Sequence, residues 1–264
     1  MSPYAVKLIT PKLAFRVLKQ VKLGTIMNFS RNYWKHHKVL EEQKSHGILK
    51  PTIMRLELTT LEKNDPAIMK LDVAREAVKE GREMGIGRYE FVGGEPMIKK
   101  TLHVIETILE ENPKQNFHIC TDARLLSTQE NELNYLVKKN NIIFSLRLDG
   151  FENIHDAIRG KDSFQQVMLS AEYLAEWKCL FGANVTVKNE NISEVTTDKF
   201  INHLILKGFT YVRYSVSQET KLFFEYNDKP ILIYTDRTGT NDSASTKSQN
   251  TIIYVNNDGT LSDN

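Results

Sequence analysis

Four consecutive residues in the middle of the chain, Gly93-Gly94-Glu95-Pro96, have the side chains of a ligand-binding turn. The glycines let the backbone take positive φ or approach a ligand closely, and the carboxylate of Glu95 can pair with an ammonium group. Pro96 fixes φ at the entry to a helix. The same tetrapeptide would also make a tight strand-to-helix turn without any ligand, so on its own it leaves both interpretations open.

A second polar group, Asp149, His155, Asp156 and Arg159, comes later in the chain. A histidine between carboxylates can titrate near neutral pH and act as a general acid or base. The alternative is that these side chains cap the next helix and pair with one another at the surface. Four polar residues lie around a later predicted strand, namely Asn184, Thr186, Asn189 and Asn191. They can contact a ligand, or they can simply form hydrogen bonds within the loop, and the sequence leaves both alternatives open.

The elements that must position these residues alternate between short β-branched runs and longer stretches of helical periodicity. This alternation is typical of βαβ units with a parallel sheet, which binds ligands at the carboxyl ends of its strands. The predicted strands are Ile53–Thr60, Arg88–Val92, Asn116–Thr121, Ile142–Leu148, Phe181–Val187 and Tyr211–Val216. The predicted helices are Asp72–Met84, Thr101–Glu111, Gln129–Lys139, Phe164–Trp177 and Thr197–Leu206. The sequence thus predicts an α/β core over residues 52–217.

An amino-terminal arm, residues 1–51, precedes this core. Thr10 and Pro11 predict the N-cap and first residue of an amphipathic helix. No Asp or Glu occurs before Glu41, so the arm is basic. We expect this helix to pack on the core with a solvated outer face; docking to a membrane surface, a protein partner or a nucleic acid are the alternatives.

A small β extension, residues 218–264, follows the core. Lys221–Tyr226 and Ile231–Thr235 are candidate strands, and residues 236–250 are rich in Ser, Thr, Asn and Asp, which predicts a flexible loop. Thr251–Val255 then leads into the turn residues Asn257-Asp258-Gly259. We therefore expect a short hairpin at the end of the chain.

Taken together and in order, the motifs resemble the radical S-adenosylmethionine (SAM) superfamily. The matching segments are Leu56–Thr60, Gly93–Pro96, Cys120–Leu126, Ser145–Gly150, His155-Asp156 and Arg159-Gly160. The third and fourth of these look closest to the hopanoid-associated branch that includes adenosylhopane synthase. The resemblance implies a partial (β/α)6 TIM-like barrel. It also implies that SAM or an analogue is bound by Gly93, Gly94, Glu95, Pro96, Thr121, Ser145, Asp149 and Arg159.

The chain departs from this family at the loop after Thr60, where members carry three cysteines spaced CxxxCxxC. Here the segment Leu61–Lys70 is shorter and contains no cysteine. The chain has only Cys120 and Cys179, and carboxylates do not replace thiolates on a [4Fe–4S] cluster. We therefore expect no iron–sulfur cluster, no other metal site and no reductive cleavage of SAM.

Three functions fit these observations. The first is a cluster-less pseudoenzyme that binds SAM or a related ligand, or that regulates or presents substrate to a partner enzyme. The second is a SAM-dependent transferase that uses polar chemistry with Glu95, Asp149 or His155; the third is a radical enzyme whose cluster loop is altered in this chain. The balanced net charge of +2 and the lack of a long apolar run or signal segment predict a cytoplasmic protein without specific nucleic-acid binding, with peripheral membrane association as an alternative.

Overall fold

The computed structural model of the protein describes residues 10–45, 51–60, 66–216, 229–237 and 251–262. The chain divides into two compact units. One, named here the Glu95 unit, comprises Leu23–Thr121, Asn134–Ile143 and Ser248–Asn264. The other, named the Asp149 unit, comprises Met1–Lys22, Asp122–Leu133 and Phe144–Lys247.

The strands of the Glu95 unit lie in the order β9-β8-β1-β2-β3. β1 (Pro51–Thr59), β2 (Arg88–Gly93) and β3 (Phe117–Thr121) are parallel, as predicted. β8 (Thr251–Val255) and β9 (Leu261–Ser262) form the expected terminal hairpin. β8 also pairs in parallel with β1, so the end of the chain extends the same sheet.

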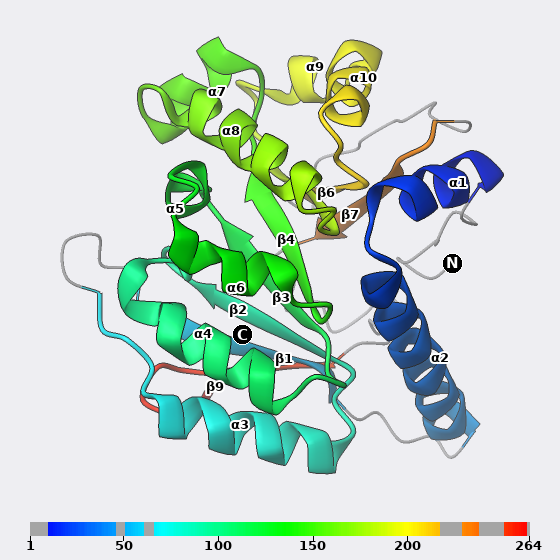
Figure 1. Cartoon of the computed structure of the whole chain (residues 1–264), viewed down its shortest axis with the longest axis vertical. Helices are drawn as coiled ribbons and strands as arrows, with labels where there is room; N and C mark the ends of the chain where they lie inside the picture. Colours follow the sequence, from blue (N-terminus) through cyan, green and yellow to red (C-terminus); the bar gives the residue numbers. More distant parts are fainter. Residues whose placement is uncertain (1–9, 46–50, 61–65, 217–228, 238–250, 263–264) are drawn as a thin grey trace. The chain divides into compact units, whose positions relative to one another are not determined.

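Helices α3 (Leu71–Met84) and α4 (Lys99–Glu111) cover one face of these strands (Figure 1). The buried residues of that face alternate along the strands with polar ones, as in Met54, Leu56 and Leu58 of β1. A Cβ added to Gly81 of α3 would lie 2.8 Å from the hydroxyl of Tyr89 on β2. The glycine therefore permits close helix-to-sheet packing. α2 (Leu23–Ser45) and the short α6 (Asn134–Lys138) complete the unit.

The Asp149 unit carries the strands β4 (Ile142–Arg147), β5 (Phe181–Thr186), β6 (Tyr211–Val216) and β7 (Leu232–Arg237) in that order, all parallel. Its helices are α1 (Pro11–Gln20), α5 (Arg124–Ser127), η1 (Asn131–Leu133), α7 (Glu152–Arg159), α8 (Ser163–Glu176), α9 (Ile192–Val195) and α10 (Asp198–Leu206). Tyr214 of β6 donates its hydroxyl to the carbonyl of Val195 at 2.6 Å, which places α9 on one face of the sheet.

The amino-terminal helix forms as predicted. Thr10 Oγ1 accepts a hydrogen bond from the amide of Leu13 at 3.2 Å. Arg16 donates to the carbonyls of Ile205, Phe209 and Pro230, which fixes α1 within the Asp149 unit. Burial lowers the pKa of Arg16 to about 10, so the guanidinium remains charged at neutral pH.

Several secondary-structure predictions were correct, one was wrong, and others lie outside the described residues. The single helix expected over Gln129–Lys139 begins two residues later and consists of η1 followed directly by α6; Gln129 has φ +51° and therefore lies outside the helical stretch. β7 extends two residues into the predicted loop 236–250. The rest of that loop and the candidate strand Lys221–Tyr226 are not among the described residues. Within the described part, no helix has the length and apolar content needed to cross a bilayer.

Candidate functional site

The turn after β2 is built against the end of β1. Gly93 has φ +127°, and a Cβ at that position would lie 2.1 Å from the carbonyl oxygen of Thr59. The amide of Gly94 donates to the same oxygen at 3.3 Å. Any side chain larger than hydrogen would therefore displace the turn, so Gly93 is required by the fold whether or not a ligand binds there.

Glu95 joins the carboxyl ends of three strands. Its Oε1 accepts hydrogen bonds from Thr121 Oγ1 at the end of β3, at 2.6 Å, and from the amide of Met97, at 3.0 Å. Its carbonyl accepts from Thr59 Oγ1 at the end of β1, at 3.1 Å. Thr121 is fully buried, whereas Glu95 is partly exposed. The carboxylate is thereby held in a fixed orientation at the carboxyl edge of the parallel strands, the edge at which parallel α/β folds generally place their ligands.

Residues Ala67–Met69 lie beside the end of β1. The amide of Thr60 donates to the carbonyl of Ala67 at 3.1 Å, and the amide of Met69 donates to the carbonyl of Leu58 at 3.0 Å. A β-bridge joins Thr59 to Ile68 in antiparallel orientation. These bonds hold Ala67–Met69 against the last residues of β1.

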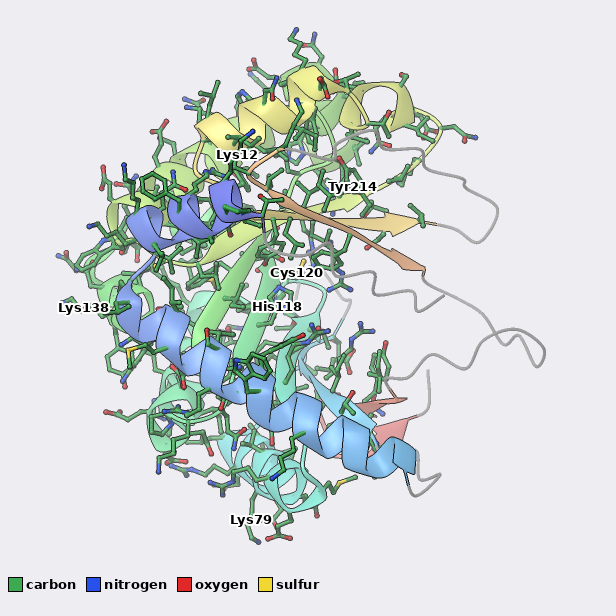
Figure 2. All side chains as sticks on the ribbon, turned by 90° about the vertical axis from the view of Figure 1, so that its right-hand side faces the viewer. Lys12, Lys79, His118, Cys120, Lys138 and Tyr214 are labelled. Carbon is green, nitrogen blue, oxygen red and sulfur yellow. The ribbon has the colours of Figure 1, made fainter. Side chains whose placement is uncertain are left out.

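The cysteines of the chain do not fit an iron–sulfur cluster. Cys120 lies on β3 and is labelled there in Figure 2, whereas Cys179 belongs to the Asp149 unit. Burial raises the pKa of Cys179 to about 11, so this sulfur stays a thiol at neutral pH. A [4Fe–4S] cluster needs several thiolates converging on one point, and two separated cysteines cannot supply them.

In the Asp149 unit, Asp149 is buried and bonded on both oxygens. Oδ2 accepts from Nε of Arg159 at 2.6 Å, and Oδ1 accepts from the amide of Thr186 at 2.7 Å. Nδ2 of Asn191 donates to the carbonyls of Asp149 and Thr186, at 2.9 Å each. Asp149 thus joins the end of β4 to α7 and to the end of β5. Asn191 was among the polar residues identified in the sequence, and the structure assigns it a loop-stabilising role.

His155 and Asp156 serve the fold of α7 and α8. The amide of Asp149 donates to Nδ1 of the buried His155 at 3.0 Å, so Nδ1 carries no proton. Burial lowers the pKa of His155, which favours the neutral ring. Asp156 accepts from the amides of Asp162 and Phe164 at 2.8 Å each. Of the two interpretations of this group, capping describes Asp156.

Ser145 is fully buried beside the hydroxyl of Tyr211. The two hydroxyls lie 2.7 Å apart, and the Tyr211 hydroxyl also lies 3.0 Å from the carbonyl of Phe144. A Cβ on Gly182 of β5 would lie 2.5 Å from the Tyr211 ring, so this glycine makes room for it. The sequence did not indicate Tyr211, because a tyrosine in a β-branched run is typical of any strand.

The sequence analysis also missed two rows of polar residues that cross the sheets. Arg55, Glu90 and His118 occupy directly paired positions on β1, β2 and β3, with Arg55 Nε 2.8 Å from Glu90 Oε2. In the other unit, paired positions from β4 to β7 hold Arg147, Asn184, Arg213 and Tyr234. Paired residues point to the same face. Charged residues within otherwise apolar strands, such as Arg55 of β1, Glu90 of β2 and Arg213 of β6, were the signal that could have revealed these rows.

The model for the Radical SAM superfamily matches residues 52–201, more than half of the chain. The protein belongs to the radical SAM superfamily. No curated protein sequence matches it.

Solved radical SAM structures share its fold. SuiB of Streptococcus suis bound to S-adenosylmethionine superposes with a TM-score of 0.61 at 12% identity, over 84% of this chain and 62% of SuiB. SuiB bound to the precursor peptide SuiA superposes with a TM-score of 0.62 at 12% identity, over 85% of this chain and 62% of SuiB. Native anSMEcpe with bound AdoMet and a peptide superposes with a TM-score of 0.50 at 20% identity, over 68% of this chain and 56% of anSMEcpe. The chain thus spans about three fifths of the length of SuiB. These similarities confirm the predicted α/β fold, a partial barrel of radical SAM type.

The structure assembles the predicted radical SAM site residues in two groups. Gly93, Gly94, Glu95, Pro96 and Thr121 come together in the Glu95 unit; Ser145, Asp149 and Arg159 belong to the Asp149 unit. That both groups bind one ligand stays a prediction. Thr59, which holds the Glu95 carbonyl, was recognised only as part of the first strand.

Proposed function

We propose that this radical SAM family member binds SAM or a related small ligand without an iron–sulfur cluster, and therefore does not cleave SAM reductively. The observation that carries the proposal is the fixed carboxylate of Glu95 at the carboxyl ends of β2 and β3, in a chain with only two cysteines. The fold of SuiB, which is bound to SAM in one solved structure, supports it.

In this proposal, Glu95 pairs with an ammonium group of the ligand while Gly93 and Gly94 keep the backbone close. Thr121 positions Glu95 and does not have to touch the ligand. Ser145 and Asp149 are engaged within the protein, so they act as positioning residues. The side chain of Arg159, in the Asp149 unit, is 29% exposed and can pair with a carboxylate of a ligand bound to that unit.

A ligand-binding fold without redox chemistry suits a regulatory or substrate-presenting subunit. SuiB binds a precursor peptide in one solved structure. We propose that this chain likewise binds a peptide or a protein partner. A cytoplasmic location agrees with free cysteines, whose thiols stay reduced there.

Isothermal titration calorimetry of the purified chain with SAM, S-adenosylhomocysteine and methylthioadenosine tests the proposal. Because no iron chelates the amine and carboxylate of SAM, we expect a Kd in the micromolar range or weaker, about −8 kcal/mol or less favourable. Glu95→Gln keeps an acceptor for Thr121 and Met97 but removes the negative charge. We expect it to weaken SAM binding by about 1.5–3 kcal/mol, the usual contribution of a charge-assisted hydrogen bond.

Glu83→Gln is the matched control, because Glu83 is an exposed glutamate of the same unit. It should leave the affinity for SAM unchanged. Absence of binding by the wild type, or equal binding by Glu95→Gln, would overturn the proposal. Mass spectrometry of the mixture after incubation should recover intact SAM; turnover would instead identify a transferase that uses polar chemistry.

A further inference from the structure

Helix α2 buries polar side chains and exposes large apolar ones, the reverse of an ordinary surface helix. Its inward side carries Thr25 and Asn28, which are buried, and the partly buried Asn32. Asn32 Nδ2 donates to the carbonyl of Lys114 at 2.8 Å and to Asn116 Oδ1 at 2.7 Å. Asn28 Nδ2 and Thr25 Oγ1 likewise bond to carbonyl and side-chain oxygens of the Glu95 unit. The helix is therefore held to its own unit largely by polar groups.

The outward side of α2 is apolar. Leu23, Met27 and Trp34 are separated by four and seven residues, which places them in one line along the helix, opposite Thr25, Asn28 and Asn32. Their exposed fractions are 64%, 64% and 70%. Figure 2 shows α2 on the near side of the Glu95 unit. A row of large apolar side chains that covers no core is the usual mark of a contact surface.

The exposed apolar residues of the protein concentrate in this part of the chain. Within the described residues, ten large hydrophobic side chains are exposed, and four of them belong to α2: Leu23, Met27, Tyr33 and Trp34. Singly scattered exposed hydrophobics need no explanation, but a concentration of this kind does.

The charge of the same segment identifies the partner. Residues 23–40 contain Arg31, Lys35 and Lys38 and no Asp or Glu, and Glu41 and Glu42 follow near the end of α2. Arg31 and Lys38 are exposed. An apolar line with tryptophan, bordered by cations, matches an anionic lipid surface, where the ring lies at the headgroup level and the lysines reach the phosphates.

We propose that the outer face of α2, defined by Leu23, Met27 and Trp34, docks the protein onto anionic phospholipid bilayers with the helix lying in the plane of the membrane. The line from Leu23 to Trp34 extends about 16 Å along this 23-residue helix, so its first three turns can lie against lipid. The proposal is independent of the SAM site, since it rests on a different element and a different ligand chemistry.

Co-sedimentation of the full chain with vesicles tests this docking. The probes are vesicles of phosphatidylcholine alone and of phosphatidylcholine mixed with phosphatidylglycerol. We expect binding to the mixed vesicles and much weaker binding to the neutral ones, with a decrease at high salt because exposed charges are screened. In a Trp177→Phe background, Trp34 is the remaining tryptophan, and its emission should shift to shorter wavelength when mixed vesicles are added.

The double variant Met27→Glu with Trp34→Glu should reduce vesicle binding on the order of tenfold or more, because it places two carboxylates on the docking face. Both side chains are exposed, so the fold should be retained, which circular dichroism checks. Leu206→Glu makes the same kind of change at an 85% exposed leucine of α10 and should leave binding unchanged.

Three results would overturn the proposal. They are the absence of vesicle binding at low salt, equal binding by the double variant, and a wild-type dimer that the double variant makes monomeric while neither binds lipid. The last result would assign the face of α2 to a second copy of the chain.

Discussion

The hydroxyl of Thr121 donates to Oε1 of Glu95 across 2.6 Å, so a buried residue at the end of β3 sets the direction of a carboxylate in the turn after β2. The bond couples two segments that are 26 residues apart in the sequence. Through this bond the tertiary structure fixes the orientation of the Glu95 carboxylate, which the sequence motif alone does not specify.

Thr121→Val should therefore impair ligand binding without touching the ligand. The isosteric change removes the donor, leaves Glu95 with the amide of Met97, and should cost about 1 kcal/mol in the free energy of unfolding. We expect the Kd for SAM to rise severalfold in calorimetry. Thr121→Ser retains a hydroxyl and should bind nearly as the wild type does; equal binding by the valine variant would show that Thr121 positions nothing.

Gly93→Ala should destabilise the protein strongly. The added Cβ would meet the Thr59 carbonyl at 2.1 Å with φ at +127°, so both the contact and the backbone conformation oppose it. Gly85→Ala is the control, since Gly85 has φ +85° but no atom within 4 Å, and it should cost only about 1 kcal/mol. Urea denaturation compares the two variants. Equal losses would mean that the turn relaxes away from β1.

Reconstitution under anaerobic conditions with iron and sulfide should leave the protein without the charge-transfer absorption of a [4Fe–4S] cluster. The reason is that the chain contains two cysteines, on different units. The Cys120→Ser and Cys179→Ser double variant should match the wild type in iron content and SAM binding. Stoichiometric iron that survives desalting of the wild type but not of this variant would contradict the expectation.

Most of the parallel strands could be predicted from the sequence because buried strands of an α/β fold are short β-branched runs. Tyr211–Val216 was predicted to the residue, and the turn at Gly93 follows β2 as expected. The pairing of β8 with β1 could not be predicted, because local periodicity carries no information about which strands become neighbours across nearly 200 residues. The helical stretch expected from Gln129 begins at Asn131 instead, since a positive φ at a non-glycine residue such as Gln129 leaves no clear signal in a sequence.

The sequence could predict which residues belong to the candidate site, but only partly what each of them does there. The association of Glu95 with Thr121 follows from parallel topology, which brings successive strand ends to one edge. That Asp149 and Ser145 are engaged within the protein could not be inferred, because their partners are a backbone amide and a distant tyrosine. Residue types indicate which groups can bind a ligand, whereas the satisfaction of their hydrogen bonds depends on tertiary contacts.

Stability should fall on acidification through the titration of His155. Burial lowers its folded-state pKa below the ordinary value of 6.5, and Nδ1 accepts a hydrogen bond that protonation would break. Below pH 6.5 the unfolded chain therefore binds more protons than the folded one, so the free energy of unfolding decreases as the pH falls. The contribution of the neutral ring is complete above pH 6.5 and is lost progressively between that value and the folded-state pKa.

Urea denaturation at pH 7.5 and pH 5.5 measures this effect. His203 contributes in the same direction, because burial and Lys207 also lower its pKa. We expect His155→Gln and His203→Gln each to lose stability at pH 7.5 and to show a smaller decrease towards pH 5.5 than the wild type does, with the smallest decrease in the double variant. His103→Gln replaces an exposed histidine of α4 and is the control for the substitution itself; it should follow the wild type. If the double variant were destabilised by acid as much as the wild type, groups other than these histidines would control the acid response.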